Sequence, residues 1–379
     1  MQNFIFHNPT KIIFGKNTIN AIGKEVKKSA AKKVLLLAGS GSIKNNSVYE
    51  QITASLKGSG IEWFELWGVK ANPTLEHAQR AISIIKEIGI DAIVAAGGGS
   101  VIDEAKAVAA GVFVDDIWDA YLGKISISKA LPIFTVLTIS ATGSEMNPTS
   151  VLSNEKAQKK LPLASQLLRP LASIIDPSVQ SSLPWEQTVN GGIDILAHIF
   201  ESYFAGSSQE VTIALNESLM KTVINCIDTL AQDEKNYSAR ANLAWTATLA
   251  LNGISAAGII GDWASHRIEH SISAVHTNIA HGTGLGVVFP AWIKYVYKEN
   301  IELFQRWAKN IWNANSVEQA ISLFQQKLKD WKAPTKLSEL GIKYEELDFI
   351  ASNSLETPTL GVVKLLNQND VLEILKLAY

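Results

Sequence analysis

The sequence contains little cysteine and almost no net charge. Among its 379 residues there is one cysteine, Cys226, so no disulfide can form within the chain. Lys and Arg number 34 and Asp and Glu 36, which gives a net charge of −2 and argues against the basic surface of a nucleic-acid-binding protein. A hydrophobic content of 47% with 18% charged residues is typical of globular proteins. We therefore predict a globular cytoplasmic protein that binds no nucleic acid.

Long apolar runs are also scarce. The N-terminus lacks the basic start and the extended apolar segment of a signal peptide. Residues 241–261 carry no charge and could span a bilayer by length, but they are rich in Asn, Thr, Ser and Gly. We interpret this stretch as a buried helix pair broken near Asn252-Gly253, and we predict no membrane partner.

The pattern of apolar runs predicts two domains of different class. "KKVLLLAG", "IEWFELWG", "DAIVAAGGG", "LPIFTVLT" and "LASIIDP" are typical of buried strands, and helical patterns separate the first four, which indicates a parallel sheet. "NFIF" and "KIIFG" flank an Asn-Pro turn, which predicts a hairpin or paired edge. After residues 176–184 only helical patterns follow. We predict an α/β, Rossmann-like domain over residues 1–180 and an all-α domain over 181–379.

Two glycine-rich loops follow predicted strands. "AGGGS", residues 96–100, opens a helix, and "AGSGSIK", residues 38–44, ends the first strand of the alternation. Backbone N–H groups at such turns favour anions, and ligands bind open α/β sheets at the carboxyl ends of their strands. Neither loop is G-x-G-x-x-G, so two tight turns without a ligand remain the alternative. The second loop has two serines and Lys44 but no acid, which favours NADPH over NADH, unless Glu62 or Glu65 holds the ribose.

A third polar loop, "LTISATGSEMN", follows another predicted strand. Its side chains suit a ribose, an amide or a phosphate, and they are Thr138, Ser140, Thr142, Ser144 and Asn147. A Ser/Thr-rich turn that caps a helix is the alternative interpretation.

The histidine distribution indicates a metal site. Asp194 and His198 lie four residues apart in an apolar run, so they share a helix face, and a buried carboxylate requires compensation. Four of the seven histidines fall in one short segment, at positions 266, 270, 276 and 281. Spacing alone pairs His266 with His270. Three imidazoles and one carboxylate suit zinc or ferrous iron, whereas histidines satisfied at a helix–helix contact are the alternative.

Motifs along nearly the whole chain resemble those of the iron-containing (group III) alcohol dehydrogenases. They include "HNPTKIIFGK", "GVKANPTLE", "AAGGGSVIDEAKAVA", "LTISATGSEMN", "DPSVQSSLP", "NGGIDILAHIFESYF", "DWASHRIEH", "AHGTGLGVVFPAW" and "NDVLEILKLA". Within that family, the NADPH-dependent, butanol-dehydrogenase-like aldehyde reductases are most similar. The family often has proline before its last metal histidine, where this chain has Ala280.

The resemblance implies roles for individual residues. The implied metal ligands are Asp194, His198, His266 and His281, so the family pattern selects His281 over His270. His270 matches a family position near the substrate, where it or a water molecule is expected to donate the catalytic proton. Gly39 replaces the aspartate of NAD-using relatives, as in NADP-using ones. The implied cofactor-binding residues, together with those of the polar loops, are Gly39, Ser40, Gly41, Ser42, Asn72, Gly98, Gly99, Ser100, Asp103, Thr138, Ser140, Thr142, Asn147 and Lys160.

The resemblance also implies the architecture and the reaction. It predicts a dehydroquinate-synthase-like fold, a homodimer, one Fe2+ or Zn2+, and NADP(H)-linked interconversion of small aldehydes and primary alcohols. A metal- and nucleotide-dependent lyase of the dehydroquinate-synthase type is the alternative, but it requires a basic cluster for a substrate phosphate, for which Arg240 and Arg267 are the few candidates. A non-catalytic sensor is a third hypothesis.

Overall fold

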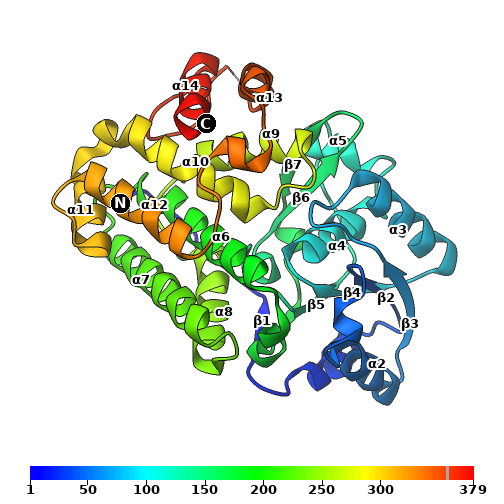
Figure 1. The fold of residues 1–379 in the computed structure, drawn as a ribbon. Coiled ribbons are helices and arrows are strands. Elements are labelled where there is room, and N and C mark those ends of the chain that lie inside the picture. Colours follow the sequence, from blue (N-terminus) through cyan, green and yellow to red (C-terminus); the bar gives the residue numbers. More distant parts are fainter. Residues whose placement is uncertain (356–357) are drawn as a thin grey trace. The chain divides into compact units, whose positions relative to one another are not determined.

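A computed structural model describes residues 1–355 and 358–379, which form two compact units. The α/β unit comprises residues 7–183 and 235–248, and the helical unit comprises residues 1–6, 184–234 and 249–379 (Figure 1). The chain passes from one unit to the other between Leu183 and Pro184, close to the boundary predicted at residue 180. Residues 1–6 belong to the helical unit and residues 235–248 to the α/β unit, the reverse of the predicted assignment. Long-range packing, which local sequence pattern does not reveal, determines the unit to which each segment belongs.

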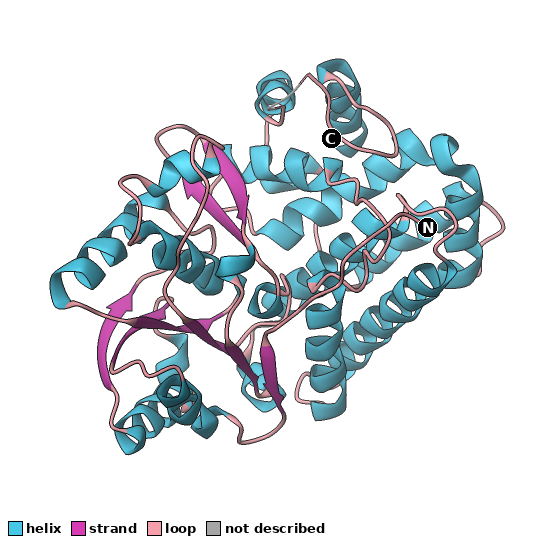
Figure 2. Ribbon diagram, turned by 180° about the vertical axis from the view of Figure 1, so that it is seen from behind, coloured by secondary structure: helices cyan, strands magenta, loops and turns pink. Residues whose placement is uncertain are grey.

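The α/β unit contains a six-stranded, fully parallel sheet in the order β1-β8-β5-β4-β2-β3 (Figure 2). The strands are β1 (Lys11–Phe14), β2 (Lys33–Ala38), β3 (Glu62–Trp67), β4 (Ala92–Gly97), β5 (Ile133–Leu137) and β8 (Ala172–Ile175). The five strands of the predicted parallel sheet are thereby confirmed. Of the two N-terminal alternatives, the hairpin is wrong, because "NFIF" forms no strand and the Gln2 amide donates to the Gly258 carbonyl. The run "KIIFG" does form a paired edge, since β1 is an edge strand that pairs in parallel with β8.

Alternating side chains bury both faces of the sheet. Leu35 and Leu37 of β2 face one hydrophobic cluster, whereas Val34, Leu36 and Ala38 face the other. Helices α3 (Leu75–Ile88), α4 (Gly99–Gly111) and α5 (Ile117–Tyr121) belong to the first cluster, and α1 (Ile22–Lys28) and α2 (Val48–Ser59) belong to the second. This double burial explains why the central strands β2, β4, β5 and β8 are almost continuous apolar runs, whereas the edge strands β1 and β3 are partly exposed.

An antiparallel pair, β6 (Thr149–Asn154) and β7 (Lys159–Ala164), was not predicted. Its sequence, "TSVLSNEKAQKKLPLA", is too polar to signal buried strands. The pair is attached to α4, because the Ser150 hydroxyl donates to the Asp103 carbonyl and the Val151 amide donates to the Asp103 carboxylate.

The helical unit is organised around α10 (His281–Val296), which packs against α6 (Trp185–Tyr203) and α9 (Ala264–Val275). The other helices are α7 (Glu210–Gln232), α11 (Ile301–Trp312), α12 (Val317–Asp330), α13 (Leu347–Asn353) and α14 (Gln368–Ala378). Among the residues described in this unit, β pairing is limited to one isolated bridge between Leu360 and Leu366.

The uncharged segment 241–261 forms one helix rather than the predicted pair. Helix α8 (Tyr237–Leu251) ends directly before Asn252-Gly253, where the break was predicted, and regular helix resumes only at α9. The second predicted helix is wrong because Gly253 and Gly258 adopt φ values of 105° and 76°, in the left-handed region that interrupts a helix. Across the described ranges, no helix combines the length and apolarity that a membrane crossing requires.

Candidate active site

The two glycine loops follow β2 and β4, which are adjacent in the sheet. The chain turns from β2 to its neighbour β3 on one side, and then returns to β4 on the other side of β2. The carboxyl ends of these two strands therefore form the topological switch point, where doubly wound sheets bind ligands. Gly39–Ser42 and Gly98–Ser100 both lie at this point.

At the start of α4, Gly99 lies in close contact with Thr142 of the third polar loop. A Cβ on Gly99 would lie 2.2 Å from the Thr142 Oγ1 and 2.4 Å from its Cγ2, so only glycine leaves room for that side chain. The Ser100 hydroxyl donates to the Ala71 carbonyl at 2.5 Å. The exposed amides of this helix start suit an anion such as a pyrophosphate.

Asp103 and Lys106 hold the third polar loop from one face of α4. Lys106 Nζ donates to Ser144 Oγ at 2.7 Å and to Asn147 Oδ1 at 3.0 Å, while the Ser144 hydroxyl also donates to Asp103. Burial lowers the pKa of Lys106 to about 8. Asp103 thus orders the loop that carries Asn147, and Lys106 is a residue that sequence analysis did not assign.

The remaining predicted cofactor residues lie in the same unit. Lys160 on β7 donates from Nζ to Asn72 Oδ1 at 3.0 Å, which joins two segments far apart in sequence. The Ser140 hydroxyl donates to Gln180 Oε1 at 2.8 Å, so its proton is engaged in a buried hydrogen bond within the protein. Thr138, directly after β5, is buried.

The acidic residues of β3 are Glu62 and Glu65, and Glu65 already has hydrogen-bond partners. The Glu65 carboxylate accepts hydrogen bonds from the Tyr49 hydroxyl at 2.6 Å and from the indole Nε1 of Trp63 and Trp67. Glu62 is the first residue of β3, at the opposite end of the strand.

In the helical unit, Asp194 and His198 project from one face of α6, as their spacing predicts. Asp194 Oδ1 lies 3.8 Å from Nδ1 of His198, and both side chains are buried. Burial lowers the pKa of His198 to about 3, although the Asp194 charge acts in the opposite direction. The imidazole is therefore neutral near pH 7, which is the form that binds metals.

His281 reaches the same point because α10 touches α6. A Cβ on Gly282 would lie 2.1 Å from the Asn190 carbonyl oxygen, and the Thr283 hydroxyl donates to Asn190 Oδ1 at 2.8 Å. Asn190 precedes Asp194 by about one helical turn. As a result, His281 Nε2 lies 3.6 Å from Asp194 Oδ1.

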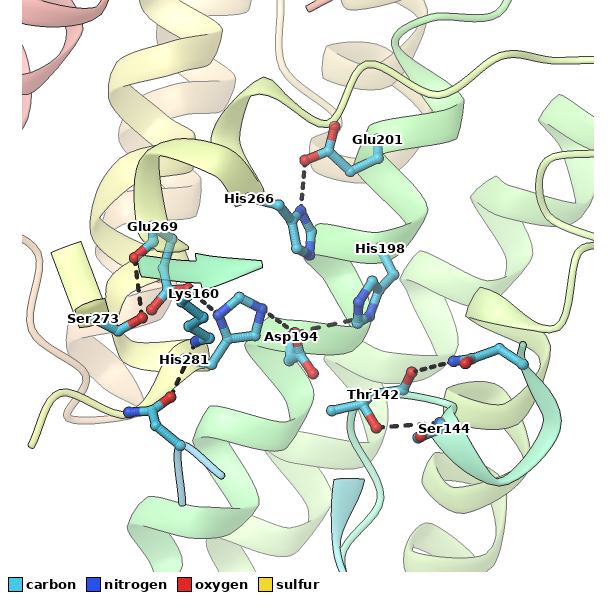
Figure 3. Close-up of polar contacts among 12 residues, drawn as sticks. Thr142, Ser144, Lys160, Asp194, His198, Glu201, His266, Glu269, Ser273 and His281 are labelled. Atoms are coloured by element: carbon cyan, nitrogen blue, oxygen red, sulfur yellow. Dashed lines mark hydrogen bonds and ion pairs between the residues drawn. The ribbon is translucent and has the colours of Figure 1, made fainter. Parts of the chain in front are cut away.

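His266 on α9 completes the arrangement in Figure 3. Its Nδ1 lies 2.6 Å from Glu201 Oε1, and its ring centroid lies 4.9 Å from that of His198 and 5.3 Å from that of His281. Without a bound cation, burial raises the pKa of Glu201 to about 8, and a cation at the neighbouring histidines would favour the ionised carboxylate.

Three of the four predicted metal ligands present donor atoms close to one another. One ligand atom from each of Asp194, His266 and His281 lies within 4.8 Å of the other two. A second group of this kind contains Glu269, His270 and His281. His198 belongs to neither group, but it faces Asp194. His276 lies outside both and contacts Glu346 at 3.2 Å.

The donor set fits a divalent cation. Asp194 Oδ1 and His198 Nδ1 are buried and have no hydrogen-bond partner among the residues that the structure describes. A cation satisfies such acceptors, and one carboxylate with several imidazoles suits zinc or ferrous iron. Its charge also compensates the buried Asp194 carboxylate.

Comparison with known protein families identifies the family of the chain. A family model of iron-containing alcohol dehydrogenase matches residues 9–177, and the model of the C-terminal part of that family matches residues 188–379. The chain belongs to the iron-containing alcohol dehydrogenase family. Membership implies a divalent metal, a nicotinamide cofactor and interconversion of alcohols and aldehydes.

Individual alcohol dehydrogenases are similar over 90% or more of their length. NADH-dependent butanol dehydrogenase A of Clostridium acetobutylicum is 37% identical, with 100% of both chains covered. NADPH-dependent aldehyde reductase YqhD of Escherichia coli is 32% identical over 90% of each chain. The crystal structure of NADH-dependent butanol dehydrogenase A from Thermotoga maritima is 49% identical, with a TM-score of 0.97 over 100% of this chain and 99% of that chain. The predicted family and fold class are confirmed.

Sequence analysis missed several residues around the histidines of the candidate site. Glu201 could have been found, because it follows His198 by three residues and therefore shares its helix face. Trp263, whose ring centroid lies 5.1 Å from that of His266, could not have been found, since its position depends on a left-handed backbone at the start of α9, with φ 63°. The Asp262 carboxylate accepts from the Val362 and Val363 amides, both at 2.7 Å, a contact that only the tertiary structure creates.

Proposed function

We propose that this protein is a metal-dependent, NADP(H)-linked alcohol dehydrogenase that reduces small aldehydes to primary alcohols. The proposal rests chiefly on the convergence of Asp194, His266 and His281 from three helices, with His198 beside them. The relatives named as butanol dehydrogenases and as an aldehyde reductase support the substrate class.

The side chains of Asp194, His198, His266 and His281 would hold one Fe2+ or Zn2+. When bound, the cation supplies Lewis-acid polarisation of a carbonyl oxygen, and the nicotinamide supplies the hydride. Two further features of the chain favour this role. His198 is kept neutral by burial, and His281 is held at Asp194 by the contact between Gly282 and Asn190.

His270 is the proposed proton donor for the product alcohol. It is buried on α9, one helical turn after His266, and its ring centroid lies 5.3 Å from that of His281. Histidine is suited to general acid catalysis near neutral pH. The balanced reaction takes one aldehyde, one NADPH and one proton to one alcohol and NADP+.

The cofactor preference is proposed from the loop after β2. This loop contains Ser40, Ser42 and Lys44 with no acid, a composition that suits a 2′-phosphate, and Glu65 is engaged by three aromatic side chains. Several relatives are named NADH-dependent, so both cofactors must be measured. A homodimer and a cytoplasmic location remain predictions.

The deciding experiment combines metal analysis with steady-state assays of the purified protein. We expect bound iron or zinc, oxidation of NADPH on addition of butanal or other small aldehydes, and a higher kcat/KM with NADPH than with NADH. A higher kcat/KM with NADH would reject only the cofactor assignment. Absence of aldehyde-dependent oxidation with either cofactor, in a metal-loaded sample, would reject the reductase assignment.

A further inference from the structure

Two buried glutamates lie directly against histidines of the proposed metal site. Glu201 Oε1 is 2.6 Å from Nδ1 of His266, and Glu269 Oε2 makes a shorter contact with Nδ1 of His281. Both glutamate side chains are completely buried. Each pair also joins two helices, since Glu201 is on α6 and His266 on α9, whereas Glu269 is on α9 and His281 on α10 (Figure 3).

We propose that Glu201 and Glu269 are positioning residues that fix the orientation and the proton-bearing nitrogen of His266 and His281. The inference rests on the proposed function, because it concerns ligands of the proposed metal. A carboxylate that accepts from Nδ1–H leaves the imidazole lone pair on Nε2. For His281 this is the nitrogen that faces Asp194, at 3.6 Å.

Glu201 has a second contact that strengthens the assignment. Its Oε2 accepts a hydrogen bond from the backbone amide of Trp263, the residue that precedes α9. Trp263 has φ 63° and ψ 6°, a conformation that costs energy for a bulky residue and persists only when its surroundings hold it. One carboxylate therefore fixes both the first turn of α9 and the ring of His266, which lies in that turn.

The position of Glu269 depends on a glycine of α10. A Cβ on Gly284 would lie 2.7 Å from Glu269 Cγ, so the side chain occupies space that only glycine leaves open. Of the four predicted ligands, His281 has the most exposed side chain, at 22%, and it is the first residue of its helix. Packing restrains it less than the others, and the Glu269 contact supplies the missing restraint.

The chain offers a matched control in its α/β unit. Glu104 is also completely buried, and its Oε1 lies 2.5 Å from Nδ1 of His77. That histidine makes its other contact with the Trp67 carbonyl at 3.1 Å rather than with a group of potential metal ligands. Replacing Glu104 thus reports the cost of disrupting a buried Glu–His pair without touching the proposed metal site.

The experiment measures Zn2+ affinity by competition with a chelator in the full-length protein. The variants are Glu201→Leu, Glu269→Leu, Glu201→Gln, Glu269→Gln and the control Glu104→Gln. We expect the leucine variants to lose about 10- to 100-fold in affinity, as is typical when an outer partner of a ligating histidine is removed. The glutamine variants should lose less, because the amide oxygen still accepts from Nδ1–H, and Glu104→Gln should match the wild type.

Proton NMR of the Zn2+-loaded protein provides a second readout that does not require the leucine variants to fold. In the wild type, the Nδ1–H protons of His266 and His281 should resonate far downfield and exchange slowly. The corresponding glutamine variant should shift its own histidine's signal and speed its exchange, while Glu104→Gln leaves both signals unchanged.

The outcomes separate this inference from the proposed function. Wild-type affinity in all variants of Glu201 and Glu269, or an equal loss in Glu104→Gln, would overturn the positioning role while leaving the metal site intact. Unaltered Nδ1–H signals in the glutamine variants would also overturn it. Failure of the wild type itself to bind Zn2+, Fe2+ or any other divalent metal would reject the metal site together with the inference.

Discussion

Gly282 at the start of α10 rests against the backbone of Asn190 in α6, where a Cβ would lie 2.1 Å from the carbonyl oxygen. The adjacent His281 is thereby brought to Asp194, one turn further along α6. The close approach of two helix backbones, supported by the hydrogen bond from the Thr283 hydroxyl to Asn190 Oδ1, sets the separation of two proposed ligands.

Replacing Gly282 should therefore weaken the metal site. In Gly282→Ala the new methyl group must push α10 away from α6, because the atom it meets belongs to the backbone and cannot rotate aside. Overpacking of this kind costs about 1–3 kcal/mol of unfolding free energy. The free energy of unfolding, measured by urea denaturation, and the Zn2+ affinity should both be lower in Gly282→Ala than in Gly58→Ala. Gly58 is a helical residue with open space around it. Unchanged Zn2+ affinity in a destabilised Gly282→Ala protein would contradict this account.

Removal of a proposed ligand should abolish catalysis without abolishing cofactor binding. Asp194→Ala and His266→Ala are expected to lower the metal affinity by more than about 100-fold, beyond the usual effect of an outer partner. Aldehyde-dependent NADPH oxidation should disappear, whereas NADPH binding, measured by fluorescence, should persist because the glycine loops lie in the α/β unit. His276→Ala is the control, since His276 pairs with Glu346 outside the ligand groups. Retained activity in either ligand variant would refute the assignment.

The metal-free protein should lose stability through His198 as the pH falls. The pKa of His198 is lowered from 6.5 to about 3 in the folded state, chiefly by burial. Between these values the unfolded chain binds a proton that the folded chain does not, so the free energy of unfolding decreases with decreasing pH, by at most about 1.4 kcal/mol per pH unit. Urea titrations of wild type and His198→Asn, each treated with a chelator, isolate this contribution.

The effect of His198 must be taken as a difference between the two proteins. Glu201 has a raised pKa and acts with the opposite sign in both of them, since its folded form binds a proton more readily than its unfolded form. The wild type should lose stability relative to His198→Asn as the pH falls below about 6.5. Parallel pH profiles would show that His198 titrates normally.

A carboxylate at position 39 should shift the cofactor preference. A Cβ on Gly39 would have only the Val69 carbonyl nearby, at 3.6 Å, so a side chain fits without displacing the loop. In Gly39→Asp the carboxylate should repel the 2′-phosphate and lower kcat/KM for NADPH at least about tenfold relative to NADH, which corresponds to about 1.4 kcal/mol. Gly39→Ala is the neutral control and should keep the original ratio. An unchanged ratio in Gly39→Asp would place the 2′-phosphate elsewhere.

Local pattern sufficed for the elements that bury continuous apolar surface. The strands β2, β3, β4, β5 and β8 were each visible as β-rich runs bounded by turns, and the i,i+4 spacing of Asp194 and His198 placed both on one face of α6. The N-terminal hairpin was wrong, because the choice of a strand's partner depends on residues far away in the chain, here residues 172–175. The pair β6–β7 was missed because its sequence is mostly polar: only Leu152 and Leu161 are among the buried residues of the first hydrophobic cluster, and the contact with Asp103 on α4 comes from far away in the chain.

The sequence by itself determined which residue types were available for chemistry: a histidine cluster, a buried aspartate and two glycine loops after strands. Spacing alone favoured His270 as the partner of His266, and the family resemblance pointed to His281 instead. Only the tertiary structure showed that Gly282 lets α10 approach α6, and that Glu201 and Glu269 lie on the Nδ1 atoms of His266 and His281. Such contacts join helices far apart in sequence, and because they depend on the distance between helix backbones, no local periodicity encodes them.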